Sequence, residues 1–222
     1  MRSVAFFQKL NEHELAQIAA ISKRHKFNRN QVVFFEGSHS DSLYVIVSGS
    51  VKIYQKAQDG QEKILCVLGP NEFFGEFSLV DGQPRSASVA TLQPTEMLAM
   101  THLAFRRFAK GSPDVLWKVL EAMCERLRAV NEENFDLAFR NMSYRFVQAL
   151  LKLSEYGTSS VGGVTIVASK QDLAAMVGSG PERVPKLIQK LADRGLVHTE
   201  HDNIHIPDID ALRKALELTE DL

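Results

Sequence analysis

The segment from Phe73 to Ala90, FFGEFSLVDGQPRSASVA, constrains this chain most, because it sets a glutamate and an arginine nine residues apart in an apolar, glycine-punctuated stretch. Gly75 lets the backbone approach a ligand closely, and the next five residues are long enough for one helical turn whose free N–H groups favour an anion. The Glu76 carboxylate suits hydrogen bonds from sugar hydroxyls, whereas the planar fork of Arg85 suits a phosphate, and Ser86 supplies a further donor. The segment therefore predicts a site for a small, phosphate-bearing nucleotide. The alternative is a strand–loop–strand with a surface salt bridge.

Runs of β-branched and aromatic residues surround this segment. They are QVVFFEG from residue 31, SLYVIVSGSVKIYQK from residue 42, EKILCVLGP from residue 62 and ASVATLQPTEMLAM from residue 87. Their close spacing is typical of an antiparallel sandwich or barrel, and Asp59-Gly60 is a strong hairpin signal. The sequence thus predicts roughly 100 residues of jelly-roll-like β-structure.

A long helix is predicted from Pro113, with Ser112 as its N-cap. Within it, residues recur at alternating spacings of four and three, which is typical of a coiled-coil seam. The seam residues are Leu116, Leu120, Met123, Leu127, Val130, Asn134 and Leu137. A lone asparagine at position 134 favours a parallel two-stranded register, because it pairs with its mate. The alternative is that this stripe packs the helix on its own sheet.

The C-terminal part of the chain predicts a second domain. Ser169 to Asp172 is a capping-box-like start for the helix DLAAMVG, residues 178–180 form a turn, and a second helix runs from Pro181 to Gly195. A predicted hairpin over residues 196–206 follows it. This order is that of a helix-turn-helix with a wing.

The second of these helices carries candidate base-reading residues. Glutamate can accept a hydrogen bond from cytosine and lysine can donate to guanine, so Glu182 and Lys186 have the chemistry for direct readout, with Arg183 on their flank. Candidate phosphate contacts are Lys170, Gln171 and Lys190. Charge alone leaves open a merely solvated helical hairpin, since residues 141–222 hold nine Lys and Arg against eleven Asp and Glu.

Taken in order, these segments resemble the CRP/FNR family of bacterial transcription regulators over nearly the whole chain. The cassette of its cyclic-nucleotide-binding domains is matched by Phe74-Gly75-Glu76, by Leu79 and by Pro84-Arg85-Ser86-Ala87. The resemblance implies an α+β architecture with a β-roll at 1–112, a dimerisation helix at 113–140 and a winged helix-turn-helix DNA-binding domain at 141–222. It also implies a homodimer that binds pseudo-palindromic double-stranded DNA, works with RNA polymerase and is switched by an effector in the β-roll.

The resemblance implies a ligand set made of cassette residues and a pair on the long helix: Gly75, Glu76, Phe77, Arg85, Ser86, Val130 and Asn131. In cAMP-responsive relatives a Thr-Ser pair meets the adenine where this chain has Val130 and Asn131. Valine cannot hydrogen-bond the base, but the asparagine can both donate and accept. We expect cAMP as the effector. Cyclic di-GMP, or a β-roll that acts as a dimer module without a ligand, are the alternatives.

The start of the second helix also departs from the family pattern. Where relatives commonly have Ser-Arg-Glu-Thr-Val, this chain has Gly180-Pro181-Glu182-Arg183-Val184, so a proline replaces the usual first base-reading arginine. With Gly180 as the cap, Pro185 falls at the fifth helical position, where it lacks an N–H and crowds the preceding turn. We expect a distorted first turn and an altered site preference, with Arg183 recovering part of the contact.

Other functional classes find less support in the sequence. A cupin-type enzyme needs a close His-x-His pair, a glutamate and a later histidine, and the histidines before residue 113 lack that spacing. We therefore expect no catalysis and no metal site. Cys66 and Cys124 have no metal-ligand spacing and are expected to be buried packing residues. No apolar run is long enough for a membrane span, so a cytoplasmic protein is expected.

Overall fold

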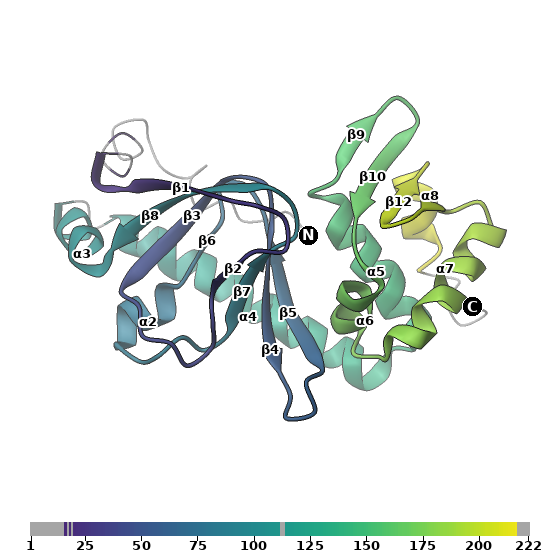
Figure 1. Ribbon diagram of the computed structural model, residues 1–222, viewed down its shortest axis with the longest axis horizontal. Coiled ribbons are helices and arrows are strands. Elements are labelled where there is room, and N and C mark those ends of the chain that lie inside the picture. Colours follow the sequence, from purple (N-terminus) through teal and green to yellow (C-terminus); the bar gives the residue numbers. More distant parts are fainter. Residues whose placement is uncertain (1–15, 17, 19, 112–113, 217–222) are drawn as a thin grey trace. The chain divides into compact units, whose positions relative to one another are not determined.

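The computed structural model describes residues 16, 18, 20–111 and 114–216 (Figure 1). Contacts divide the chain into two compact units. The first comprises residues 1–53 and 68–131, and the second comprises residues 54–67 and 132–222.

Two four-stranded sheets form the N-terminal β-structure, with strand orders β1-β8-β3-β6 and β2-β7-β4-β5. Their strands are β1 (Lys23–Phe27), β2 (Val32–Phe34), β3 (Ser42–Ser48), β4 (Val51–Lys56), β5 (Glu62–Leu68), β6 (Phe73–Phe74), β7 (Ser88–Thr91) and β8 (Thr95–Thr101). The predicted β-roll is confirmed. The hairpin at Asp59-Gly60 is confirmed too, because Gly60 has a φ of 85° and the Ala57 N–H donates to the Gln61 carbonyl at 2.9 Å.

Strand β1 was not predicted from the sequence. Its residues read KRHKF and its first four side chains are exposed, so it lacks the alternation of apolar and polar residues that marks a half-buried strand. It pairs antiparallel with β8 and ends the sheet order. Lysines on an edge strand discourage pairing with another chain, which explains this composition.

Helices α2 and α3 lie between β6 and the long helix in the chain. Helix α2 (Glu76–Asp81) is the short helix predicted after Gly75. Helix α3 (His102–Gly111) lies in a stretch for which no helix was predicted. It buries Phe105, Phe108 and Ala109, and this helical spacing of three and four residues is the sequence signal that could have revealed it.

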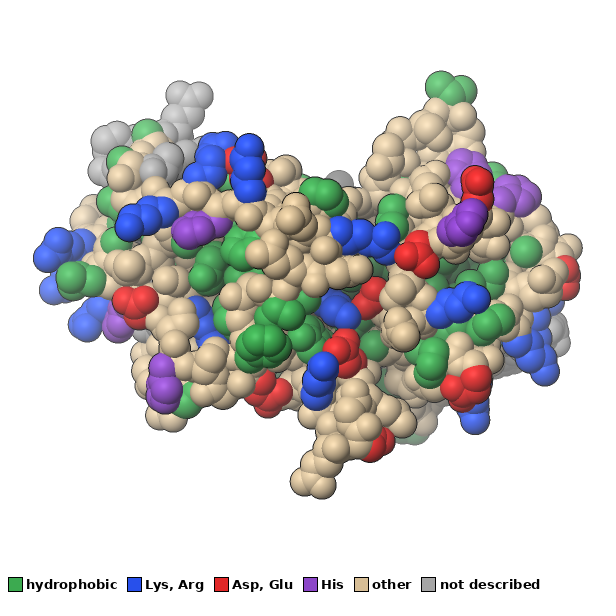
Figure 2. Space-filling view, viewed as in Figure 1, with side chains coloured by type: hydrophobic (Ala, Val, Ile, Leu, Met, Phe, Trp, Pro, Cys, Tyr) green, Lys and Arg blue, Asp and Glu red, His purple; other side chains and the backbone are tan. Residues whose placement is uncertain are grey.

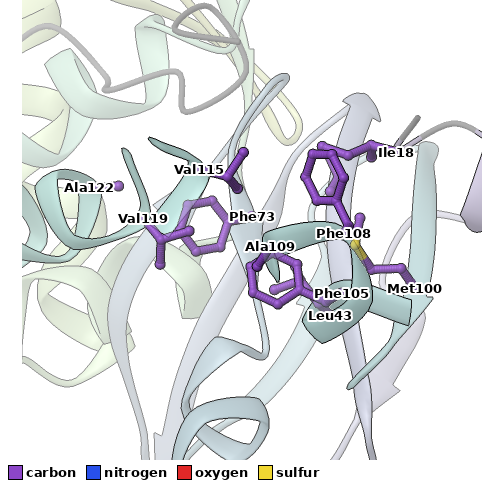
Figure 3. Close-up of a cluster of buried hydrophobic side chains, with 11 residues drawn as sticks. Ile18, Leu43, Phe73, Met100, Phe105, Phe108, Ala109, Val115, Val119 and Ala122 are labelled. Carbon is purple, nitrogen blue, oxygen red and sulfur yellow. The ribbon is translucent and has the colours of Figure 1, made fainter. Parts of the chain in front are cut away.

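The predicted long helix is α4 (Asp114–Phe139), and its expected cap at residues 112–113 lies outside the described residues. Val115, Val119 and Ala122 enter a core cluster with residues of α3, β3, β6 and β8 (Figure 3). The helix thus packs on its own domain through a stripe one position before the predicted seam. Along the seam Leu116, Leu120, Leu127 and Val130 are 47 to 61% exposed.

Met123 is the seam residue that departs from this pattern, because it is partly buried and packs against the core cluster. Asn134 is exposed and Leu137 is 39% exposed. The alternative in which the whole seam packs on its own sheet therefore fails for most of its members. Their apolar side chains remain uncovered within one chain.

The C-terminal elements are α5 (Met142–Ser154), β9 (Thr158–Ser160), β10 (Gly163–Val167), α6 (Lys170–Val177), η2 (Pro181–Arg183), α7 (Val184–Asp193), β11 (His198–Glu200), β12 (Asn203–Ile206) and α8 (Ile209–Lys214). They form a helix-turn-helix, α6 and α7, followed by the β11–β12 wing in a sheet of order β11-β12-β10-β9. This confirms the predicted winged helix-turn-helix. Strand β9 lies in the glycine- and serine-rich stretch of residues 157–163.

The expectation for the cysteines was wrong. Cys124 is exposed and Cys66 is half-buried, and the two are not joined in a disulfide. Cys124 lies on α4 next to the partly buried Met123, so helical geometry turns its side chain away from the core stripe of Val119 and Ala122.

A search of the described helices for a stretch long and apolar enough to cross a membrane finds none.

Candidate functional site

The centre of the predicted nucleotide site is Arg85, whose side chain is buried, with 3% of its surface exposed. Its Nη1 donates to the Gly75 carbonyl at 2.8 Å, and its Nη2 donates to Ser40 Oγ at 2.8 Å and to the Ser42 carbonyl at 2.6 Å. The guanidinium also lies over the Phe34 ring, 4.1 Å from its centroid. These contacts fix the arginine inside the β-roll, beside the cassette.

Arg85 is held by neutral acceptors, and this leaves its charge without a bonded carboxylate among the described residues. Burial lowers the pKa of the Arg85 guanidinium, and the nearby Tyr44, Glu76 and Asp41 oppose this effect. Its Nε is buried and makes no hydrogen bond in the part of the chain that the structure describes. A buried cation with an unused donor is the arrangement that an anionic ligand satisfies.

Gly75 could not be another residue at this site. Its φ is 85°, in the left-handed region that favours glycine, and a Cβ added there would lie 2.5 Å from Arg85 Nη1 and 2.9 Å from the Ser42 carbonyl oxygen. The glycine therefore permits the close approach of the arginine to the backbone at the start of α2. This is the role that its place before Glu76 suggested in the sequence.

Glu76 is buried with 7% of its surface exposed, and it has a partner that sequence reasoning missed. Arg126 of α4 donates through Nη1 to Glu76 Oε1 at 2.6 Å and through Nη2 to the Phe73 carbonyl. Its guanidinium lies 4.6 Å from the centroid of the Phe73 ring. Arg126 follows Val115, Val119 and Ala122 at helical spacing, and this position on the core-facing stripe was the available signal.

The remaining predicted ligand residues are more exposed. Phe77 is 49% exposed, and Ser86 is exposed next to the buried Arg85. Val130 and Asn131 follow Arg126 by about one turn of α4, and both are exposed. The structure thus brings together Gly75, Glu76 and Arg85, and it adds Arg126 to them. Phe77, Val130 and Asn131 are exposed and take no part in the hydrogen bonds of this group.

We expect replacement of Arg126 by methionine to lower the free energy of unfolding by about 1 to 3 kcal/mol, because it leaves the buried Glu76 carboxylate without its cation. Urea denaturation of the purified protein measures this change. Arg128→Met is the matched control, since Arg128 is exposed on the same helix and is not bonded to Glu76. Equal losses for the two variants would show that the Arg126–Glu76 pair contributes nothing specific.

The second predicted site begins at α6. Ser169 caps this helix, because its Oγ accepts from the Asp172 N–H at 3.1 Å and donates to the Asp172 carboxylate at 2.7 Å. Gly178 ends it with a φ of 67°. These local bonds confirm the predicted capping start and turn. Lys170 and Gln171 are both exposed in the first turn of α6.

The distortion expected from the prolines is present, but its form differs from the prediction. Pro181 to Arg183 form a 3-10 turn, η2, and the α-helix begins only at Val184. Pro185 is therefore the second residue of α7 rather than the fifth of a continuous helix. The first four N–H groups of a helix have no partner within it, so the N–H that Pro185 lacks costs no helical hydrogen bond.

The exposed face of η2 and α7 carries the predicted DNA contacts. Val184, Leu187 and Leu191 are buried, whereas Glu182, Arg183 and Lys186 are exposed. Lys190 is half-buried, and Gln189 donates to Asp193 at 2.7 Å. The Glu182 carboxylate folds back over Gly180, where it occupies the space that a Cβ at position 180 would need. The face thus offers Arg183 and Lys186 as its exposed donors beside that acceptor.

Among the described residues no group of three or more His, Cys, Asp and Glu side chains is placed to hold a metal ion.

Comparison with known families matches two parts of the chain. Residues 24–112 match the model of the cyclic nucleotide-binding domain, and residues 144–215 match that of the Crp-like helix-turn-helix domain. Both matches fall on the segments where the two candidate sites lie.

Curated relatives match over most of their length. A CRP-like cAMP-activated global transcriptional regulator of Mycobacterium tuberculosis is 33% identical over 207 residues, covering 90% of this chain and 92% of the relative. A cyclic AMP receptor protein of Thermus thermophilus is 30% identical over 89% of each chain.

Solved structures give the same result. The c-di-GMP responsive global regulator CLP of Xanthomonas campestris has a TM-score of 0.77 at 25% identity, covering 89% of this chain and 100% of that one. A transcriptional regulator of the CRP/FNR family from Thermus thermophilus has a TM-score of 0.76 at 25% identity, covering 88% and 98%.

Proposed function

The chain belongs to the CRP/FNR family of effector-responsive, DNA-binding transcription regulators, and we propose that it is a homodimer switched by cAMP. The β-roll of residues 1–112 binds the nucleotide, the helix of residues 113–140 joins two copies, and residues 141–222 bind double-stranded DNA. The observation that carries the effector site is the buried Arg85, which has neutral partners and an unused Nε.

Charge pairing supports cAMP over cyclic di-GMP. Arg126 is paired with Glu76, whereas Arg85 is bonded only to carbonyl and hydroxyl groups in the described residues. One unneutralised guanidinium matches the single phosphate of cAMP, and cyclic di-GMP carries two. The named relatives include regulators activated by cAMP and one responsive to c-di-GMP, so both ligands belong in the test.

Titration calorimetry of the purified protein with cAMP and with cyclic di-GMP tests the effector. The proposal expects saturable binding of cAMP with one site per chain and weaker binding of cyclic di-GMP. Tighter binding of cyclic di-GMP would mean that cyclic di-GMP, not cAMP, is the effector bound at this site. Absence of binding for both would favour the β-roll that acts without a ligand.

The ligand set proposed here joins the buried group to the more exposed residues: Gly75, Glu76, Phe77, Arg85, Ser86, Val130 and Asn131. Asn131 is the proposed contact to the adenine edge, since an amide both donates and accepts. RNA polymerase is the proposed partner on the DNA, and the cytoplasm the proposed location. We propose no catalytic activity, in keeping with the relatives, which are transcription regulators.

For DNA we expect two classes of variant to fail differently. Glu182→Ala or Lys186→Ala should relax preference at one base pair per half-site, worth about 1 to 3 kcal/mol, because we propose that these residues contact base edges. Lys170→Ala should weaken binding to all sequences alike and lower the salt slope by about one, as expected for a phosphate contact. Gln171 and Lys190 belong to the same proposed phosphate class.

Selection of binding sites from a random DNA pool measures the first class, and salt titration measures the second. Asp193→Ala is a matched control, because Asp193 is exposed on α7 but at its end. Selections that return the parental site with both readout variants would place base readout elsewhere, with Arg183 as the next candidate.

A further inference from the structure

Histidines gather on the wing. The chain has seven histidines, and three of them, His198, His201 and His205, fall within eight residues. In the space-filling view histidine side chains gather beside acidic ones in the region of β12 (Figure 2). Neither the helix-turn-helix helices nor the nucleotide site uses these three residues.

Two of the histidines face each other across the hairpin. His198 of β11 lies directly opposite His205 of β12, with ring centroids 6.4 Å apart and ring planes 13° apart. His201 lies at the turn, is exposed and has a φ of 56°. His198 is exposed as well, so two of the three imidazoles are open to solvent on the wing.

The third histidine, His205, is held by a hydrogen bond at each of its two ring nitrogens. His205 Nε2 lies 3.1 Å from the Gly162 carbonyl, which can only accept, so this nitrogen carries a hydrogen. His205 Nδ1 lies 3.1 Å from Thr165 Oγ1, which can accept or donate. Rotation of the threonine hydroxyl therefore lets the ring become an imidazolium without losing either bond.

Protonation of these three rings reverses the sign of the net charge on the wing. The wing also carries Glu200 and Asp202, while β9 and β10, which complete the sheet, have no charged side chain. Lys170 lies near the wing, because it is two residues after Ala168, whose N–H donates to the Asp202 carbonyl at 3.0 Å. With neutral histidines the segment from 198 to 205 bears two negative charges, and with three imidazolium ions it bears one positive charge.

We propose that the β11–β12 wing is a proton-dependent contact to the DNA phosphate backbone. The inference rests on the DNA binding proposed above and adds its pH dependence. A wing with neutral histidines repels phosphates, whereas a protonated wing attracts them and releases counterions on binding. DNA therefore favours the protonated form, and by linkage the affinity rises as the pH falls through the range in which imidazole gains its charge.

The test compares salt dependence at two pH values. The probe is a random-sequence duplex of about three helical turns, roughly 30 base pairs, since phosphate contacts are independent of sequence. For the full-length protein the slope of log Kobs against log salt should steepen by about 0.9 for each imidazolium that contacts a phosphate, on going from about pH 8 to about pH 5.5. Two such contacts correspond to about a tenfold larger loss of affinity between 50 and 200 mM salt.

The double variant His198→Gln/His201→Asn should lose most of this change in slope. Asparagine is chosen at position 201 because it tolerates the left-handed backbone there. The matched control is His25→Gln, since His25 is exposed on β1, in the other unit, and should leave the pH effect intact. Glu200→Gln removes a negative charge from the wing and should raise the affinity at pH 8.

Three outcomes overturn the inference. The first is an equal change in slope for the parent and the double variant. The second is a pH effect abolished by EDTA, which would mean that a metal held by His198 and His205 acts in place of protons. The third is that the parent binds no DNA at either pH in low salt. This result would contradict the proposed DNA binding itself, and not only its pH dependence.

Discussion

Replacing Arg85 with leucine is expected to lower the affinity for cAMP by about 2 to 5 kcal/mol, a factor of at least about thirty. Arg85 is the buried cation of the cassette, and its Nε has no partner among the described residues. Leucine leaves the phosphate of a bound nucleotide without its charge partner and its forked donor. Titration calorimetry with cAMP measures the loss.

Arg85 also supports the fold, so stability must be measured beside affinity. Its two Nη atoms donate to Gly75, Ser40 and Ser42, and leucine removes all three hydrogen bonds. Arg85→Lys is the second variant, because it keeps a cation but loses the fork, and it should bind cAMP more weakly than the parent and more tightly than Arg85→Leu. Arg128→Leu on the exposed face of α4 is the control. A folded Arg85→Leu protein that binds cAMP as tightly as the parent would contradict the proposed cAMP site at Arg85.

Charging the centre of α4, by Leu127→Glu, is expected to convert the proposed dimer to monomers. Leu127 is 61% exposed in the single chain, whereas Val115 and Val119 of the same helix are buried in its own core. In a parallel seam two glutamates would face each other away from water, at a cost on the order of 3 to 5 kcal/mol for an uncompensated buried charge. Sedimentation analysis at micromolar concentration measures the change in association.

Arg128→Glu is the matched control for this prediction, because it introduces an acidic residue one position along the same helix and outside the seam. It should leave the dimer intact. A Leu127→Glu protein that sediments as a dimer would show that the association does not use this stripe. Circular dichroism checks that the variant keeps its helices.

The two sites differ in how far the sequence predicted them. Gly75, Glu76 and Arg85 stand close together in the chain, and one short segment folds them toward each other, so their pattern was enough to predict the group that the structure assembles. Arg126 is fifty residues away from Glu76, and only the packing of α4 on the β-roll brings it to that carboxylate. Helical spacing sets Arg126 apart from Arg128, but it does not identify the carboxylate that Arg126 meets.

A similar division holds in the helix-turn-helix. The caps of α6 are local bonds between neighbours in the chain, and they were predicted from Ser169 and Gly178. The sequence also predicted that the two prolines distort the start of the second helix. Where the chain restarts as an α-helix was not predicted, because this depends on burying Val184, Leu187 and Leu191 at the same time.

The sequence by itself determined the elements whose signals are local: the alternating β-runs, the Asp59-Gly60 turn, the cassette, the long helix and the capped helix-turn-helix. Tertiary structure alone decided β1, the stripe by which α4 packs on its own domain and the pairing of Arg126 with Glu76. The physical reason is that turns, caps and periodicity act over a few residues, whereas burial depends on which distant surfaces meet. The exposed edge strand KRHKF shows this most plainly, because its only reason to be extended is its pairing with β8.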